Sequence, residues 1–297
     1  MSFSKLCKCE NFFLASPKRG LVYVGAGDDL WEPKGSDLTW YYNFAPSPSL
    51  QGSDLEYVPM LWGDRSEDSG FDSTVENLLQ SGINVKHVLG MNEPDLCADE
   101  SAGGSCIEAK KAASIWKQEI EPLKHQGISL GAPAVTQGGL WWLQDFYTEC
   151  DGGCSTDFLP IHVYSDFVGL ASYVGPVHET YPNMSIWVTE LAYPNATVPE
   201  SEHYYNQTVD FLDGLDYVAR YSYFGSFPPD AASSWVGSGG TMMNNDGELT
   251  NIGAWYLGMS SAEAGTKPES AAMILSRPCL PAWVLLGALW AFVLELG

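Results

Sequence analysis

Two glutamates in this chain each follow directly on an apolar run. Glu93 ends the segment 88–93 (VLGMNE), and Glu190 ends the segment 186–190 (IWVTE). A parallel barrel presents a catalytic acid in this way, at the carboxyl end of a strand. Pro94 would end the first strand. Two carboxylates so placed are what acid-assisted cleavage of a glycosidic bond requires.

Either glutamate alone has a simpler interpretation, because most glutamates lie on solvated loops. The matched contexts of the pair favour function over that alternative. We therefore expect the two carboxyl groups to face each other across one accessible cleft. A structure that separated them, or buried either one beneath packed side chains, would contradict this expectation.

The rest of the chain must supply the strands that position such a pair. Apolar runs predict eight β-strands, with helices between several of them, and this alternation favours a single (β/α)8 barrel. Amphipathic spacing predicts helices over 73–81, with Ser73 as N-cap, and over 109–125, 140–148 and 201–212. The predicted strands are 21–24, 38–44, 57–62, 85–90, 128–135, 158–164, 186–189 and 217–224.

Further candidate site residues lie at or near the predicted strand ends. We expect Trp40, Trp62 and Trp235 to be flat platforms for a sugar, although a core position is the open alternative for each. His162 and Tyr164 alternate along one strand and so share a face. The remaining candidates for substrate binding are Asn92, Asn43 and Tyr223.

Composition excludes several classes of partner. The 14 Lys and Arg against 37 Asp and Glu give a formal net charge of −23. Binding to nucleic acid needs clustered cations, and so does binding to an anionic membrane surface. The excess of acidic residues suits an uncharged substrate. We expect the protein to be a monomer. Gly25-Ala26-Gly27 lacks the third glycine of a dinucleotide-binding loop. The chain contains no G-x-S-x-G motif, and this disfavours a serine hydrolase.

The cysteines and sequons predict an oxidising compartment. Cys97 and Cys106 flank one glycine-containing loop, and Cys150 and Cys154 flank another, so both pairs are expected to form short disulfides. Neither pair has the spacing or the nearby histidines of a metal site, and no metal or cofactor is expected. Three N-glycosylation sequons begin at Asn183, Asn195 and Asn206.

The two ends of the chain give conflicting indications of the cellular location. Residues 1–17 lack the apolar core of a secretory signal, and we interpret them as a doubtful leader from a wrong first exon. Residues 18–260 form the predicted catalytic domain. Residues 261–279 form a polar spacer and 280–297 an apolar tail, the order of a glycosylphosphatidylinositol signal. We expect attachment at Ser270, with Ser260, Ser261 and Gly265 as alternatives and a tail-anchored helix as the rival interpretation of the tail.

The segments 18–21, 57–63, 90–95, 162–164 and 187–192 together resemble glycoside hydrolase family 128, the largely fungal β-1,3-glucanases of the clan A barrels. The resemblance covers about residues 18–258. It implies that Glu93 is the general acid/base, that Glu190 is the nucleophile and that Asn92 contacts the sugar 2-hydroxyl. It also implies a retaining enzyme on cell-wall glucan, outside the cell or anchored at its surface. We expect internal cleavage, with cleavage from the chain end as the open alternative.

Other functions remain open at this point. The same barrel could cleave β-1,4 or β-1,6 bonds, or it could bind wall glucan without cleaving it.

Overall fold

The structure of this protein is a computed structural model that describes residues 18–32, 36–97 and 103–265. The predicted leader, most of the predicted spacer, Ser270 and the apolar tail lie outside these residues. Within them, no helix is both long and apolar enough to cross a membrane.

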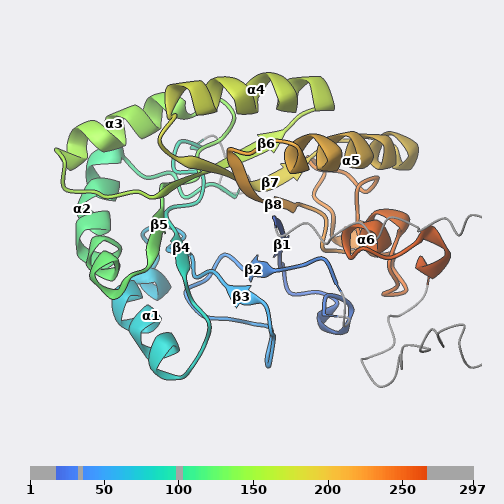
Figure 1. Cartoon of the computed structure of the whole chain (residues 1–297), viewed down its shortest axis with the longest axis horizontal. Coiled ribbons are helices and arrows are strands. Elements are labelled where there is room, and N and C mark those ends of the chain that lie inside the picture. The colour runs from blue at the N-terminus through green and yellow to red at the C-terminus, as the bar shows by residue number, and fades with distance from the viewer. Residues whose placement is uncertain (1–17, 33–35, 98–102, 266–297) are drawn as a thin grey trace, which may run out of the picture.

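Eight parallel strands form one curled sheet in the order β3-β2-β1-β8-β7-β6-β5-β4 (Figure 1). Met60, three residues beyond the edge strand β3, forms a parallel bridge to Leu89 of the other edge strand, β4. The sheet thus has the curvature of a (β/α)8 barrel, as predicted. Its strands are β1 (Arg19–Val22), β2 (Trp40–Tyr42), β3 (Glu56–Tyr57), β4 (His87–Leu89), β5 (Ser129–Gly131), β6 (Phe158–Tyr164), β7 (Ser185–Ala192) and β8 (Val218–Tyr223).

Helices pack against the outer side of much of the sheet, and short 3-10 turns fill several connections, including those around the first three strands. The helix α5 begins in a capping box made by Thr197 and Glu200, with a proline in its first turn. In α1 the N-cap is Gly70, so the prediction of Ser73 as N-cap was wrong. The α-helices are α1 (Phe71–Gln80), α2 (Ala109–Glu119), α3 (Leu140–Cys150), α4 (Phe167–Thr180), α5 (Val198–Asp213) and α6 (Asn251–Tyr256).

The sheet separates two apolar layers. The larger layer lies between the strands and the helices, and it includes Tyr41, Tyr221 and Tyr223. The smaller layer fills the inside of the barrel, with Trp40 and Trp187 among its members. Neighbouring residues of one strand enter opposite layers because side chains alternate along a strand.

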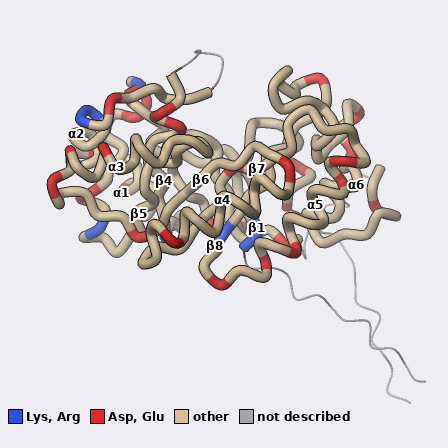
Figure 2. Tube along the Cα trace, turned by 90° about the horizontal axis from the view of Figure 1, so that it is seen from above, with Lys and Arg blue, Asp and Glu red and all other residues tan. Residues whose placement is uncertain are grey.

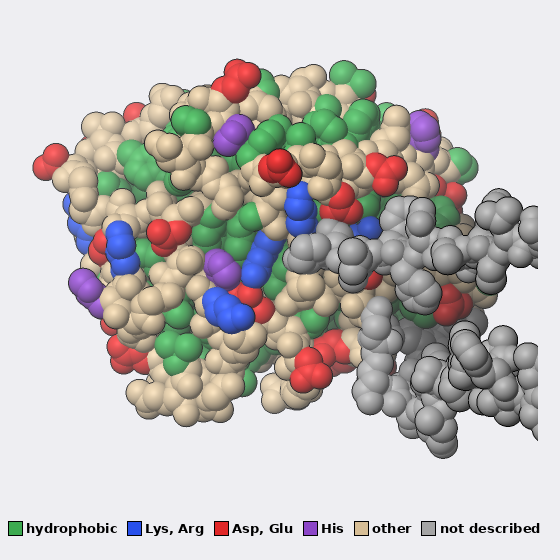
Figure 3. Space-filling model, in the orientation of Figure 1, with side chains coloured by type: hydrophobic (Ala, Val, Ile, Leu, Met, Phe, Trp, Pro, Cys, Tyr) green, Lys and Arg blue, Asp and Glu red, His purple; other side chains and the backbone are tan. Residues whose placement is uncertain are grey.

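Charged side chains are distributed unevenly. Acidic residues occur along most of the trace, whereas Lys and Arg are few and lie mainly near α2 and near β1 and β8 (Figure 2). In the face seen in Figure 3, the central Lys and Arg side chains are interspersed with acidic ones. A cluster of oppositely charged side chains joins three strands, since Glu56 of β3 contacts His87 of β4 and Arg220 of β8.

Candidate active site

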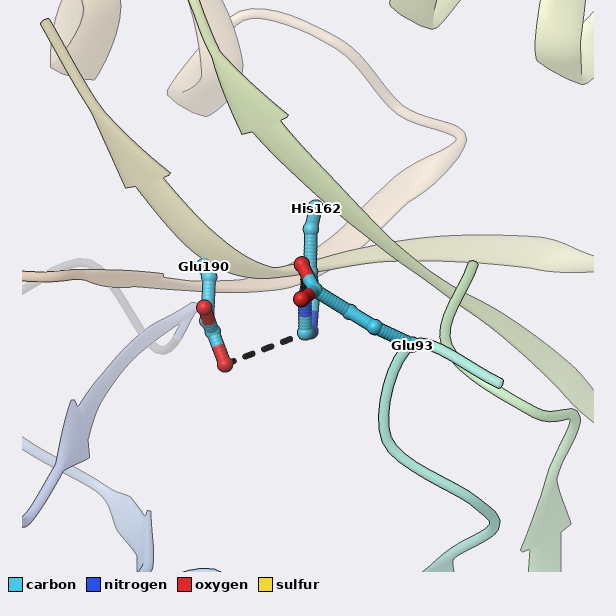
Figure 4. A group of neighbouring side chains, drawn as sticks. All are labelled: Glu93, His162 and Glu190. Carbon is cyan, nitrogen blue, oxygen red and sulfur yellow. Dashed lines mark hydrogen bonds and ion pairs between the residues drawn. The ribbon is translucent and has the colours of Figure 1, made fainter. Parts of the chain in front are cut away.

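Glu93, His162 and Glu190 meet at the carboxyl ends of their strands (Figure 4). His162 lies between the two glutamates, with Nδ1 at 2.7 Å from Oε1 of Glu93 and Nε2 at 3.5 Å from Oε1 of Glu190. A carboxylate oxygen of Glu93 and one of Glu190 lie within 4.8 Å of each other. The sequence therefore folds to bring the predicted pair together.

The backbone around Glu93 turns sharply after β4. Glu93 has φ of 41°, in the left-handed region that few non-glycine residues adopt. Its amide donates to the carbonyl of Ala134 at 2.7 Å, and Asn92 forms a parallel bridge to the same residue. The loop that follows β5 thus holds the turn, and the turn directs the carboxylate inward.

His162 and Glu190 are brought level by an irregularity between β6 and β7. The register shifts after the pair Ile161 and Val188, so that His162 pairs with Glu190. Bulges of this kind re-aim side chains, and they are common beside active sites.

Two tyrosine hydroxyls hold the Glu190 carboxylate. Tyr164 donates to Oε2 through a short hydrogen bond, and Tyr42 lies 3.3 Å from Oε1 while also donating to the carbonyl of Thr189 at 3.0 Å. Tyr42 was not singled out from the sequence. The available signal was its place at the end of β2, two residues beyond Trp40 and therefore on the same inward face.

Burial and charge set the protonation of the cluster. Burial raises the pKa of Glu190 to about 7; the His162 charge opposes this, the Glu93 charge adds to it, and the two tyrosine hydrogen bonds lower it. Burial alone would lower the pKa of His162, but the charge of Glu190 and the hydrogen bond with Glu93 raise it overall. Burial, together with the charge of Glu190, raises the pKa of Tyr164 and Tyr42 well above the usual range, so both remain donors.

The pair is more buried than the expected accessible cleft. The exposed fractions of the side chains are 9% for Glu93 and 6% for Glu190, against 0% for His162. The expectation of ready access to both acids is therefore not met. The small exposed part of the cluster belongs to the carboxylates rather than to the histidine between them.

Three other predicted residues border this cluster. Asn92 is buried; its Nδ2 donates to the carbonyl of Gly103 at 3.0 Å, and Oδ1 has no partner among the described residues. Trp235 is 55% exposed, and its ring meets the ring of Tyr164 edge to face at 4.7 Å. Trp62 is half-buried, and its carbonyl accepts from the amide of Asn92.

Two predicted residues lie elsewhere. Trp40 is fully buried inside the barrel, where it contacts Trp187, so it cannot stack on a sugar. It begins β2 and thus lies below the mouth. Tyr223 is 1% exposed and packs on the helix side of the sheet near Tyr205 and Tyr256. Alternation along β8 sends it outward, while Ser222 points in.

Asn43 lies near the site without touching the carboxylates. Its Nδ2 donates to the Ser49 hydroxyl at 2.6 Å and to the Ser47 carbonyl at 2.9 Å, and its Oδ1 accepts from Tyr57 at 2.8 Å. It lines a hollow beyond the ends of β1 and β2.

The three central side chains also offer ligand types that a divalent metal uses. In this arrangement, however, Nδ1 of His162 is hydrogen-bonded to Glu93, and the second nitrogen points toward Glu190. Nε2 of His162 has no hydrogen-bond partner among the described residues, so His162 is joined to Glu93 by a hydrogen bond and to Glu190 by charge alone.

Both predicted disulfides are formed. Cys97 is bonded to Cys106 and Cys150 to Cys154. The first closes the connection that follows Glu93. The three sequon asparagines, Asn183, Asn195 and Asn206, are exposed.

Comparisons with known proteins agree on one family. Residues 20–256 match the model of the glycosyl hydrolase catalytic core. The chain is 32% identical over 255 residues to alkali-sensitive linkage protein 1 of Schizosaccharomyces pombe. This match covers 82% of the chain but 44% of that protein, so the chain spans less than half the length of this relative.

Two solved structures illustrate what similar chains do. A family 128 (subgroup III) curdlan-specific exo-β-1,3-glucanase from Blastomyces gilchristii, in complex with glucose, is 28% identical with a TM-score of 0.67, covering 82% of this chain and 98% of its own. A family 128 (subgroup VII) oligosaccharide-binding protein from Trichoderma gamsii is 27% identical with a TM-score of 0.63, covering 81% and 92%.

Proposed function

The chain belongs to the glycosyl hydrolase catalytic core family, alongside glycoside hydrolase family 128, and on this basis we propose that it is a retaining β-1,3-glucanase. The observation that carries the proposal is the spacing of Glu93 and Glu190, whose nearest ligand oxygens lie within 4.8 Å. Retaining glycosidases hold their carboxyl groups about 5–5.5 Å apart, and inverting ones about 6.5–9.5 Å. This upper limit lies closer to the retaining range than to the inverting one, so it favours retention.

The reaction then takes two steps. Glu190 attacks the anomeric carbon while Glu93 donates its proton to the glycosidic oxygen, which leaves with the aglycone. Glu93, now ionised, takes a proton from water, and the resulting hydroxide equivalent displaces Glu190 from the sugar. The Oδ1 atom of Asn92 is available to accept a hydrogen bond from the 2-hydroxyl.

His162 and the two tyrosines prepare these groups. Glu190 must be ionised to attack, and its pKa of about 7 places that ionisation near neutrality. Hydrogen bonds from Tyr164 and Tyr42 stabilise the carboxylate, and His162 keeps Glu93 in position through Nδ1.

Substitution of each acid tests the assignment. We expect Glu93→Gln and Glu190→Gln each to lower laminarin hydrolysis, measured as reducing sugar, by several orders of magnitude. Glu179→Gln, at the exposed end of α4, is the control and should retain full activity. Unchanged circular dichroism would show that the variants fold. Full activity in either acid variant would refute the scheme.

The stereochemistry and the mode of cleavage need separate measurements. Proton NMR of the first product should show the β-anomer, and an α-anomer would establish inversion instead. We propose internal cleavage, so laminarin should yield a series of oligosaccharides early in the reaction. Glucose as the sole early product would indicate exo action, as in the Blastomyces relative.

Binding without cleavage is the second candidate function. The Trichoderma relative favours it, because that protein is described as oligosaccharide-binding. Saturable binding of laminarihexaose with no reducing-sugar release would establish this alternative. Release from lichenan, cellulose or pustulan, but not from laminarin, would instead assign a β-1,4- or β-1,6-glycanase.

We propose that the protein acts outside the cell, on wall glucan, and is held at the membrane by a glycosylphosphatidylinositol anchor at Ser270. The two disulfides and the three exposed sequon asparagines support export. Phosphatidylinositol-specific phospholipase C should release the protein from intact cells. Retention after that treatment, with release only by detergent, would support a tail-anchored helix.

A further inference from the structure

Strand β7 contains one extra residue at the point where it delivers Glu190. Against β6, the pairing moves from Val188 directly to Glu190. Against β8, the pairing moves from Val188 to Leu191 while β8 advances by only two residues. Thr189 therefore has no partner in either ladder. A bulge of this kind turns the side chains beside it, so the conformation of the Thr189 peptide decides where the Glu190 carboxyl points.

Two side-chain hydroxyls hold the Thr189 peptide. A buried carbonyl needs a donor, and Thr189 is fully buried. Its carbonyl accepts a short hydrogen bond from the Ser222 hydroxyl of β8 and a second one, at 3.0 Å, from the Tyr42 hydroxyl of β2. Ser222 is fully buried as well. The bulge is thus fixed from both sides by groups that belong to other strands.

Tyr42 has a single hydroxyl proton for two acceptors. Its oxygen lies 3.0 Å from the Thr189 carbonyl oxygen and 3.3 Å from Oε1 of Glu190. One proton cannot serve both acceptors fully. Because Ser222 also donates to the carbonyl, that carbonyl draws less on the Tyr42 proton, and the proton is more available to the carboxylate.

The other groups that face the Glu190 carboxyl are those of the cluster already described. His162 and Tyr164 approach it from β6, and Glu93 approaches it from the turn after β4 (Figure 4). The hydrogen bond from Ser222 goes to the backbone and not to this carboxyl. Any effect of Ser222 on Glu190 must therefore pass through the Thr189 peptide and the Tyr42 hydroxyl.

We propose that Ser222 is a positioning residue for the nucleophile, because its hydroxyl holds the Thr189 carbonyl at the bulge and leaves the Tyr42 hydroxyl to Glu190. The proposal rests on the proposed role of Glu190 and adds a residue that the sequence did not single out.

A titration of the Glu190 carboxyl tests this role directly. The pKa is followed by NMR in protein labelled with carbon-13 at the glutamate carboxyl, and the signal is identified by its absence from Glu190→Gln. Hydrogen bonds to the ionised form lower a carboxyl pKa. Ser222→Ala should therefore raise the pKa of Glu190, by about 0.5 or more for the weakening of one hydrogen bond.

Ser226→Ala is the matched control. Ser226 is also a fully buried serine whose hydroxyl donates to a backbone carbonyl, but that carbonyl belongs to Val22 of β1. The strand β1 supplies no side chain to the cluster around Glu190. Ser226→Ala should therefore leave the pKa of Glu190 unchanged. Equal shifts in the two variants, or no shift in Ser222→Ala, would overturn the proposal.

Tyr42→Phe identifies the route of the effect. This substitution should itself raise the pKa of Glu190, and adding Ser222→Ala to it should raise the pKa no further. A further rise in the double variant would overturn the proposal, because Ser222 would then act without Tyr42.

Ser222→Cys keeps the test decisive if Ser222→Ala does not fold. The thiol is a weaker donor than the hydroxyl, so the pKa of Glu190 should rise in this variant by less than in Ser222→Ala. No rise in Ser222→Cys would overturn the proposal in the same way.

Failure of the proposed function is distinguishable from failure of this inference, since the titration does not depend on hydrolysis. In an active enzyme, the acidic limb of kcat/KM on laminarin should move to higher pH in Ser222→Ala and stay in place in Ser226→Ala. An unmoved limb in Ser222→Ala would overturn its role in positioning the nucleophile. A wild type that cleaves no β-1,3-glucan would refute the glucanase, while the titration would still decide whether Ser222 controls the Glu190 carboxyl.

Discussion

Glu190 is the residue that decides the chemistry, because burial and its neighbours shift the pKa of its carboxyl group in opposite directions. Removal of water raises its pKa, whereas Tyr164 and Tyr42 donate hydrogen bonds that favour the ionised form. A nucleophile must be ionised, so the acidic limb of the pH profile reports this balance. Activity should fall as the pH drops through the pKa of Glu190.

Tyr164→Phe tests that balance. Without the hydroxyl, the pKa of Glu190 rises further, so the acidic limb of kcat/KM should move to higher pH by about one unit, equivalent to about 1.4 kcal/mol. Tyr223→Phe is the control, because the Tyr223 hydroxyl is also buried but lies on the helix side of the sheet. A limb that stays in place, or moves to lower pH, would show that Tyr164 does not tune Glu190.

Trp235 is the exposed aromatic residue beside the cluster. Its ring rests on Tyr164, so a sugar bound over Glu190 would meet it. We expect Trp235→Ala to lower kcat/KM on laminarin by about 10-fold, the equivalent of about 1.4 kcal/mol. Trp141, on α3, is similarly exposed at 58% and touches none of these residues, so Trp141→Ala should leave the value unchanged. Equal effects of the two substitutions would remove Trp235 from the site.

At the scale of elements, each of the predicted strands corresponds to a strand of the sheet, but two helices were missed, the short α6 and the longer α4. Its sequence contains Gly169, Gly175 and an internal Pro176, all of which disfavour a helix locally. Packing of Leu170, Val174 and Val177 against the sheet outweighs that preference. Apolar contacts formed at long range are invisible to local propensity.

The N-cap of α4 is a measurable part of that stability. The Asp166 carboxylate accepts from the amide of Gly169 at 2.8 Å. We expect Asp166→Ala to lower the free energy of unfolding in urea by about 1 kcal/mol, because Asn or Asp at this position caps the helix and Ala cannot. Asp166→Asn should be nearly neutral. A loss of the same size in both would point to the charge rather than to the cap.

At the scale of the whole molecule, Glu56 connects three strands at the amino ends of the barrel. Its carboxylate lies 2.5 Å from Nδ1 of His87 and 2.6 Å from the Arg220 guanidinium, which also covers the ring of Trp187. Burial alone would raise the pKa of Glu56, but the hydrogen bonds from His87 and Arg220 outweigh it and lower the pKa. The folded state therefore binds the Glu56 proton less tightly than the unfolded chain does.

The Glu56 cluster should stabilise the folded state more at neutral pH than at acidic pH. A carboxylate with a depressed pKa contributes stability above its unfolded pKa of about 4.3, and that contribution is lost as the pH falls through the folded pKa. Glu56→Ala should cost about 3 kcal/mol at neutral pH, the lower end of the range for a buried pair, because it leaves the half-buried Arg220 without its partner. The difference in thermal midpoint between wild type and variant should shrink below about pH 4. A constant difference across this range would exclude Glu56 ionisation as its source.

The resemblance to family 128 was confirmed by the comparisons, and it rested on short segments that carry the site. Individual roles were harder to predict. Trp40 and Tyr223 have the residue types expected of a sugar-binding mouth, yet one lies too low in the barrel and the other on its outer face. An error of one or two positions along a strand changes the layer or the depth of a side chain.

By itself the sequence determined the alternation of strands and helices, the two short disulfides and the two acids at strand ends. These depend on residues close together in the chain, where periodicity and turn chemistry act. The placement of His162 between those acids, the recruitment of Tyr42 and the burial of the pair were decided only by the tertiary structure. The physical reason is that curvature of the sheet and a register shift between β6 and β7 bring distant strand ends together, and no local pattern encodes that geometry.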